Sequence, residues 1–207
     1  MITVKINKKI KTYKGNSQLI VNAVFPPGSV TKIYGPSGAG KTTFLKIIAG
    51  LVTPEQGMIK STEDFWLDTD TNINWKPQQR RVGFVFQDFA LFPNMTVIEH
   101  LKYATDDQEL INRLLVIGKM ESFTGHRPRH LSGGQQQRLA ILRALALKPA
   151  LLLMDEAFSA LDDELRESLV TGIKILLKEF GTTTIIVSHH VQETASFANR
   201  ELKIELE

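Results

Sequence analysis

Residues 35–42 carry the clearest chemistry in the sequence, because a glycine-rich loop there ends in a lysine and a hydroxyl. The loop reads Gly35-Pro36-Ser37-Gly38-Ala39-Gly40-Lys41-Thr42, with Thr43 after it. Its three glycines leave space for backbone amides to wrap around a phosphate, and the helix expected next adds the positive end of its dipole. Lys41 can bind the β- and γ-phosphates, and the Thr42 hydroxyl can ligate Mg²⁺. The loop therefore predicts a nucleoside triphosphate site, and the alternative is a glycine-rich turn before a chance lysine.

Residues 131–135 predict a second place where backbone amides face an anion. They read Leu131-Ser132-Gly133-Gly134-Gln135, and a helix is expected to run on to about residue 147. Ser132 is a natural N-cap, and the two glycines leave the first amides of the helix exposed. From the spacing alone, a capped surface helix with a flexible start explains the segment equally well.

Asp155 and Glu156 supply a pair of carboxylates at the end of the apolar run 151–154. The run is short and lacks alternation, which is typical of a buried parallel strand. A carboxylate that ends such a strand is well placed to hold the shell of a Mg²⁺ ion, in part through water. Two acids that simply mark a strand entering solvent are the alternative, and the phosphate loop upstream favours the metal.

Hydrophobic patterning predicts the elements that must position these residues. Strands are expected at residues 2–6, 19–25, 30–34, 81–86, 151–154, 183–187 and 202–206. One helix is expected from Lys41 to about residue 51, and another where apolar residues recur at helical spacing between residues 165 and 180. Residues 88–148 have mainly helical patterning. Strand, helix and strand in this order predict a parallel α/β core with a helical insertion.

Composition and charge exclude several classes of protein. The 207 residues are 43% hydrophobic and 23% charged, which are the proportions of an ordinary globular protein. The chain has no cysteine, which excludes disulfides, thiol catalysis and metal sites ligated by cysteine. A net charge of +3 from scattered residues requires no nucleic-acid partner, and we expect none. No apolar stretch reaches the roughly 18–20 residues that cross a bilayer, and the alternating N-terminus predicts a strand, not a signal peptide.

Taken together and in this order, the motifs resemble those of the ABC (ATP-binding cassette) ATPases. Residues 131–135 resemble the signature motif, residues 151–156 the Walker B strand and residues 159–162 the D-loop. Gln87 matches the Q-loop position and His189 the H-loop position. The resemblance covers essentially the whole chain. It implies an α/β fold with the P-loop NTPase core of an ABC ATPase, an N-terminal antiparallel β region and an inserted helical subdomain.

The resemblance also implies how the chain is divided and assembled. Residues 1–87 and 149–207 are expected to form the nucleotide-binding core, and residues 88–148 the helical subdomain with the signature motif. In the family, the phosphate loop and the signature of one chain lie too far apart to share a nucleotide. Two copies, expected to be identical, therefore pair head to tail around ATP. Ser159 and Asp162 are expected to communicate across that interface.

The catalytic and metal-binding roles follow from the same resemblance. Glu156 is expected to act as general base on the attacking water, with Gln87 and His189 completing the catalytic set. Mg²⁺ is expected on Thr42, Gln87 and Asp155. These roles depend on the position of each residue in the order of motifs.

Tyr13 lies at about the spacing of the aromatic that stacks on adenine in the family, a contact that needs no base-specific hydrogen bonds. An aromatic residue on a strand face is the alternative. The residues expected to bind ATP are Tyr13, Gly35, Pro36, Ser37, Gly38, Ala39, Gly40, Lys41, Thr42, Thr43, Leu131, Ser132, Gly133, Gly134 and Gln135.

Residues 88–97 resemble the segment of importer ATPases on which a permease docks, and they offer apolar side chains for such a contact. This implies an ATPase subunit of an ABC membrane transporter, peripheral on the cytoplasmic face of the cell membrane. Its partners would be transmembrane permease subunits and an extracytoplasmic substrate-binding protein. The alternatives are that Phe89, Leu91 and Phe92 only pack the helical lobe, or that the chain is a soluble ABC ATPase.

Residues 76–88 resemble the ATPases of molybdate importers, which implies molybdate or a related oxyanion as the transported substrate. The same stretch is also similar to the lipoprotein-release and macrolide-efflux group, so an efflux system is the alternative. The sequence ends soon after the H-loop position, and we expect no C-terminal regulatory domain.

Overall fold

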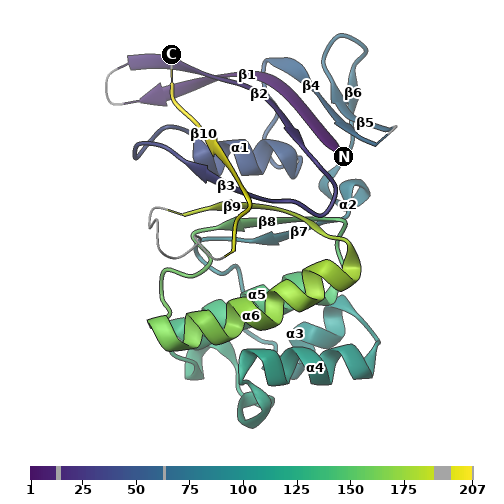
Figure 1. The fold of residues 1–207 in the computed structure, drawn as a ribbon, viewed down its shortest axis with the longest axis vertical. Helices are drawn as coiled ribbons and strands as arrows, with labels where there is room; N and C mark the ends of the chain where they lie inside the picture. Colours follow the sequence, from purple (N-terminus) through teal and green to yellow (C-terminus); the bar gives the residue numbers. More distant parts are fainter. Residues whose placement is uncertain (13–14, 63, 189–196, 207) are drawn as a thin grey trace.

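The structure is a computed structural model that describes residues 1–12, 15–62, 64–188 and 197–206. Its strands form two sheets on either side of helix α1 (Lys41–Ile48), and the other long helices cover the outer face of the second sheet (Figure 1). No helix in these described ranges is long and apolar enough to span a membrane.

The first sheet is antiparallel and begins with a long hairpin. Its strands lie in the order β2 (Gly15–Phe25), β1 (Ile2–Thr12), β4 (Gln56–Ser61), β5 (Asp64–Asp68) and β6 (Ile73–Asn74). Alternate residues of the hairpin face the core, where Val4, Leu19 and Phe25 are at most 1% exposed. The hairpin therefore covers one side of α1 with its apolar face.

The second sheet is parallel throughout. Its strands lie in the order β10 (Arg200–Lys203), β3 (Val30–Tyr34), β9 (Thr183–Val187), β8 (Leu151–Asp155) and β7 (Val82–Val85). Every residue of β8 and β9 is buried, because helices or strands cover both faces of the sheet. The predicted parallel α/β core, the antiparallel β region and the helical insertion are confirmed.

Helix α1 has a broad apolar face, and residues of both sheets pack against it. Phe44, Leu45, Ile47 and Ile48 have no exposed surface. They belong to one cluster with residues from the hairpin and from the parallel sheet. An apolar face of this width is stable only when other elements cover it. Its start, which follows the glycine-rich loop, is therefore held between two layers.

A short helix, α2 (Pro77–Arg80), lies beside α1, where Arg80 donates to the carbonyls of Ile47 and Ile48 (Figure 1). The longer helices form the third layer. They are α3 (Val97–Ala104), α4 (Gln108–Gly118), α5 (Gly133–Ala146) and α6 (Asp163–Phe180), with short 3₁₀ turns at Glu121–Phe123 and Pro128–His130. Side-chain N-caps start the four long helices, at Thr96, Asp107, Ser132 and Asp162. At the end of α4, a Cβ on Gly118 would lie 2.5 Å from Cδ1 of Leu142, so glycine lets α4 approach α5 closely.

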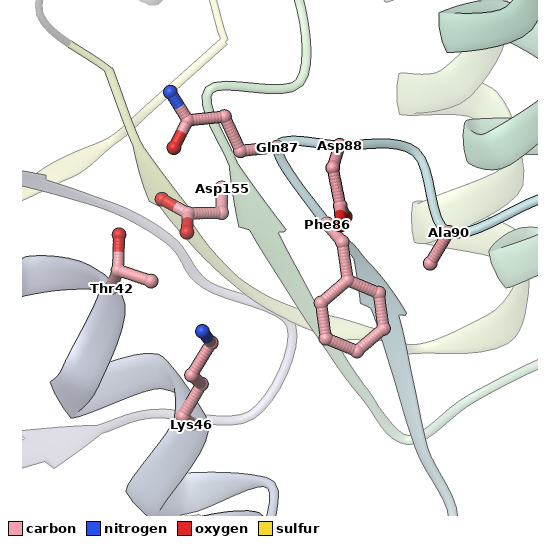
Figure 2. A pocket seen from close by; sticks show the side chains of 7 residues that line it. All are labelled: Thr42, Lys46, Phe86, Gln87, Asp88, Ala90 and Asp155. Carbon is pink, nitrogen blue, oxygen red and sulfur yellow. The ribbon is translucent and has the colours of Figure 1, made fainter.

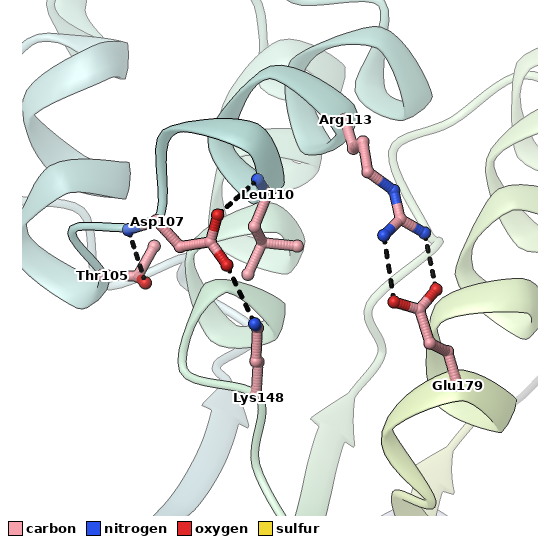
Figure 3. Close-up of polar contacts among 6 residues, drawn as sticks. All are labelled: Thr105, Asp107, Leu110, Arg113, Lys148 and Glu179. Carbon is pink, nitrogen blue, oxygen red and sulfur yellow. Dashed lines mark hydrogen bonds and ion pairs between the residues drawn. The ribbon is translucent and has the colours of Figure 1, made fainter.

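Two ion pairs tie α4 to the elements beside it (Figure 3). Arg113 on α4 contacts Glu179 on α6 through two bonds of 3.0 and 2.6 Å. Lys148, after α5, contacts Asp107 at 2.9 Å, and Asp107 also accepts the amide of Leu110 as the cap of α4. The pKa of Glu179 and that of Asp107 are lowered, chiefly by hydrogen bonds from Arg113 and from the Leu110 amide respectively. These exposed pairs orient α4 more than they stabilise it.

Some sequence expectations were incomplete. The strands expected at residues 30–34 and 183–187 are observed with those bounds. No strand was expected between residues 56 and 74, where three occur, because these segments depend on pairing with β1 and with one another. The strand expected at residues 202–206 lies earlier, at Arg200–Lys203, where it pairs with β3. Residues 88–148 contain helices and no strand, while the exact domain bounds remain a prediction.

Candidate functional site

The glycine-rich loop joins β3 to α1, as expected from its sequence. Gly35 has φ of 153°, and a Cβ there would lie 2.1 Å from the carbonyl oxygen of Ile204. Gly40 has φ of 85° and caps α1. The loop therefore depends on glycine at both ends, and it delivers the first amides of α1 to one side of the sheet.

Lys41 begins α1 and is folded back onto the loop. Its side chain donates to the carbonyl oxygens of Gly35 and Pro36 at 2.9 and 2.8 Å, and the residue is 6% exposed. Burial lowers the pKa of Lys41, and the charges of Glu156 and Asp155 oppose this change. The ammonium is thus held within the loop by neutral carbonyls and by carboxylates nearby.

A cavity of about 500 Å³ opens beside the start of α1 (Figure 2). It brings together side chains from α1, from the segment after β7 and from the end of β8, namely Thr42, Lys46, Phe86, Gln87, Asp88, Ala90 and Asp155. Three of the predicted site residues, Thr42, Gln87 and Asp155, therefore share one cavity. Lys46 lies one helical turn beyond Thr42 and was not predicted as a site residue.

Asp155 is the buried acid of this cavity. It is 1% exposed, and its Oδ1 atom has no hydrogen-bond partner in the described part of the chain. Burial raises the pKa of Asp155, against an opposing hydrogen bond from Thr42, whose hydroxyl points toward it in Figure 2. The charge of Glu156 raises the pKa further, and that of Lys46 lowers it. A buried carboxylate oxygen without a partner is a position at which a cation can bind.

Glu156 follows β8 with an unusual backbone. Its φ is 51°, in the left-handed region that residues with a Cβ rarely occupy. Its amide donates to the carbonyl of Val187, which extends the β8–β9 ladder by one bond. Its carboxylate accepts a bond of 3.2 Å from the Gln87 amide. Backbone strain at an acid beside a phosphate loop is consistent with a functional position.

The signature segment forms the predicted capped helix start. The Ser132 hydroxyl accepts from the amide of Gln135, and the Gln135 side chain accepts from the amide of Ser132, at 3.3 and 2.8 Å. Ser132 and Gly133 are exposed. No residue from 131–135 lines the cavity beside α1. The signature segment is therefore separate from that cavity in this chain.

The two residues expected at a dimer interface also have contacts within the chain. The Ser159 hydroxyl donates to the carbonyl of Glu156 at 3.0 Å, and Asp162 accepts the amide of Leu165 as the cap of α6. Their communication across a dimer remains a prediction. Tyr13 and His189 lie outside the described residues, so their roles also remain predictions.

Two polar residues near the site had no assignment from the sequence. His100 on α3 has no exposed surface and accepts the amide of Phe92 at 2.9 Å. Arg143 on α5 donates to the carbonyls of Ala90 and Phe89 at 2.7 and 3.2 Å. Phe89 and Ala90 have φ of 64° and 45°, so these bonds support a strained turn after Gln87. Nothing local in the sequence indicates such contacts.

Comparisons with known proteins agree with this geometry. The model of the ABC transporter family matches residues 20–159. The sulfate/thiosulfate import ATP-binding protein CysA of Mesostigma viride is 41% identical over 89% of this chain and 54% of its own length. The molybdenum import ATP-binding protein ModC of Photobacterium profundum is 35% identical over 98% of this chain and 56% of its own length. The chain thus spans little more than half of each of these relatives.

The chain is also similar to a solved structure over nearly the full length of both chains. That structure is the dimeric structure of a post-hydrolysis state of the ATP-binding cassette MJ0796 bound to ADP and Pi. It is 34% identical, has a TM-score of 0.81, and is matched over 99% of this chain and 94% of that chain. The family model and this likeness together cover the glycine-rich loop, the cavity and the signature helix, and the chain belongs to the ABC transporter family as an ATP-binding cassette.

Proposed function

We propose that the chain is the ATP-binding and ATP-hydrolysing subunit of an ABC importer. The observation that carries this proposal is the cavity in which Thr42, Gln87 and Asp155 meet beside the glycine-rich loop. The loop supplies groups for phosphate and the cavity supplies groups for a metal. Glu156, adjoining both, supplies a base.

The phosphates of ATP would lie in the loop from Gly35 to Thr43. Lys41 would exchange its two carbonyl partners for phosphate oxygens, which are charged and therefore stronger acceptors. The first amides of α1 and the helix dipole would add to this attraction. Tyr13 is proposed to stack on adenine.

The cavity residues fit a Mg²⁺ ion. In the described ranges, no group of three or more His, Cys, Asp or Glu residues could hold a metal. Mg²⁺, however, keeps several waters and needs only one or two carboxylates. The unpartnered Oδ1 of Asp155, the Thr42 hydroxyl and the Gln87 amide oxygen would hold such an ion. Bound there, it would neutralise charge on the β- and γ-phosphates.

Hydrolysis would depend on Glu156. Its carboxylate would accept the proton of the attacking water, a role that contributes typically about 10²–10⁴-fold to a rate. The bond from Gln87 restrains one carboxylate oxygen and links Glu156 to the turn that contains Phe89 and Ala90. His189 is proposed to hydrogen-bond the γ-phosphate.

A complete site would require two copies of the chain. Ser132, Gly133 and Gly134 are proposed to bind the γ-phosphate on the partner's glycine-rich loop. Their absence from the cavity of the same chain supports this arrangement. The MJ0796 cassette was solved as a dimer, which supports the same view. ATP would then hold two cassettes together, and its hydrolysis would release them.

The segment after Gln87 is proposed as the docking surface for a permease. Phe92 is 38% exposed and Tyr103 is 68% exposed, and their rings meet edge to face at 5.2 Å. Phe89 and Leu91 are partly buried against the core. One side of the segment therefore packs internally, while the other offers aromatic surface. Docking would place the chain on the cytoplasmic face of a membrane, where permease subunits and an extracytoplasmic substrate-binding protein complete the transporter.

The substrate is proposed to be molybdate or a related oxyanion. Of the two relatives described above, one is named for sulfate and thiosulfate import and the other for molybdenum import. Both names specify import, which favours an importer over a lipoprotein-release or efflux system. Substrate choice would belong to the permease and its binding protein.

Co-purification from native membranes tests the transporter proposal. Tagged Glu156→Gln, which should bind ATP and stall before hydrolysis, is expected to recover a multi-span permease when membranes are solubilised with ATP and Mg²⁺. Lys41→Ala, which removes the phosphate-binding ammonium and is expected to abolish hydrolysis, is the control and should recover less permease. Mass spectrometry identifies the partners. Recovery of ribosomal or DNA-repair proteins alone would overturn the transporter assignment and leave the ATPase assignment intact.

A further inference from the structure

Gln137 is a buried amide on the signature helix that belongs to none of the motifs described above. It lies on α5 and is 1% exposed, among neighbours that include the fully buried Leu139, Ala140 and Ile141. A buried amide is costly unless its polar atoms have partners. Its contacts therefore indicate why a glutamine is used at this position.

Both ends of the Gln137 amide bind the turn that follows β8. Nε2 donates to the carbonyl of Glu156 at 3.1 Å and approaches the Ser159 hydroxyl at 3.4 Å. Oε1 accepts the amide of Ala160 at 3.0 Å. One side chain thus fixes a carbonyl at the start of the turn and an N–H at its end.

That turn is strained at the residue proposed as the base. Glu156 has φ of 51°, which costs free energy that surrounding contacts must offset. Its carbonyl also accepts the amide and the hydroxyl of Ser159, at 3.3 and 3.0 Å. Of these donors to the carbonyl, Gln137 comes from outside the turn. It therefore ties the turn to the signature helix.

We propose that Gln137 is a positioning residue that fixes the turn from Glu156 to Ala160 and thereby aims the Glu156 carboxylate. This inference rests on the proposed function, because it takes Glu156 as the general base. Ser132, which is proposed to bind the partner's nucleotide, is the N-cap of helix α5. The same helix therefore connects one nucleotide site to the base and the D-loop serine of the other.

Steady-state ATPase kinetics of the full chain with Mg²⁺ and ATP test the proposal. Gln137→Met keeps the length of the side chain and removes both polar ends. We expect kcat to fall by about 10- to 100-fold, the scale of a small misplacement of a catalytic group. The KM for ATP should change little, because the glycine-rich loop is untouched. Gln108→Met is the matched control, since Gln108 on α4 bonds Asn112 on its own helix, and it should leave both constants unchanged.

Gln137→Glu provides a second test that does not depend on the fold tolerating methionine. A protonated glutamic acid can donate to the Glu156 carbonyl and accept from Ala160, whereas its carboxylate can only accept. The kcat of this variant relative to wild type should therefore rise as pH falls, since burial favours the protonated form. A ratio that is independent of pH, or a kcat for Gln137→Met equal to that of wild type, would overturn the positioning role.

Amide hydrogen exchange separates failure of this inference from failure of the proposed function. If the wild type hydrolyses no ATP, the proposed function fails, and exchange then decides the role of Gln137. Exchange over residues 156–161 should accelerate in Gln137→Met and not in Gln108→Met. Unchanged exchange in both variants would refute the inference.

Discussion

Lys41 and Asp155 are charged residues of the site whose burial disfavours their ionised forms. Burial lowers the pKa of Lys41 and raises that of Asp155, so it disfavours the ammonium in one case and the carboxylate in the other. Phosphate and Mg²⁺ would offset these effects, because each supplies the opposite charge at short range. Burial of Lys41 and Asp155 therefore lowers the stability of the fold, and the same burial would strengthen their attraction to a ligand of opposite charge.

His100 predicts a pH dependence of stability. Burial lowers its pKa, and the charge of Arg143 acts in the same direction, while the bond to the Thr96 carbonyl and the charge of Glu99 oppose it. As pH falls, His100 therefore takes up a proton in the unfolded chain near the ordinary pKa of 6.5, while it stays neutral in the folded chain down to a lower pH. Stability from neutral His100 is fully present above that value and is lost as pH falls through it.

Urea denaturation at several pH values between about 7.5 and 5.5 measures this effect. The wild type should lose at most about 1.4 kcal/mol of unfolding free energy per pH unit through this residue. His100→Gln should be less stable at high pH and should show a shallower decline toward low pH. An equal decline in both proteins would mean that His100 does not remain neutral in the folded chain.

The site residues that the sequence predicts belong to short motifs, whose members are close along the chain. The loop from Gly35 to Thr42 builds its shape from its own glycines, so a short motif describes it fully. Gln137 and Lys46 act on residues that lie 19 and 109 positions away, Glu156 and Asp155, and no local pattern marks them. The sequence therefore indicates the groups proposed to contact the nucleotide better than the groups that position them.

Helix α4 ends in a residue whose backbone is strained. Its C-cap, Lys119, has φ of 50° and is exposed. A residue with a Cβ pays roughly 1–2 kcal/mol to occupy the left-handed region, and glycine avoids this strain. Glycine also gives the unfolded chain more conformational freedom, which lowers the free energy of unfolding by about 0.4–1 kcal/mol. Lys119→Gly should therefore raise the free energy of unfolding by about 0.5–1 kcal/mol.

Chemical denaturation of Lys119→Gly checks this value, with Lys102→Gly as the control. Lys102 lies inside α3 and is exposed, so glycine there should destabilise the chain by about 1 kcal/mol. Destabilisation by both substitutions would show that the end of α4 carries no strain.

The sequence predicts the strands that are buried on both faces, and it misses or misplaces strands that form only by pairing with another strand. Strands β8 and β9 are apolar throughout, so composition alone indicates them. Strand β4 contains few apolar residues and forms against β1, from Ile2–Ser61 to Asn7–Gln56. Strand β10 lies earlier than expected because Arg200 to Lys203 pair with Thr31 to Tyr34, while Ile204 fills the core beyond them. Tertiary pairing decided both cases.

In the molecule as a whole, two sheets enclose α1 and leave open the end that is proposed to bind phosphate (Figure 1). The signature segment begins α5 in the helical layer and does not line the cavity beside α1. The resemblance of the motifs predicted this separation. A second copy with the opposite orientation would complete both sites. We therefore expect the chain to dimerise when it binds ATP.

Size-exclusion chromatography of Glu156→Gln, coupled to light scattering, tests whether ATP causes the chain to dimerise. The chain has a mass of 23.2 kDa. With saturating ATP and Mg²⁺, the variant should elute at twice this mass, and it should return to the monomer with ADP. Adding Ser132→Arg, which blocks the segment offered to the partner, should keep the monomer in ATP. A Glu156→Gln protein that binds ATP but remains monomeric at every concentration would contradict the composite site.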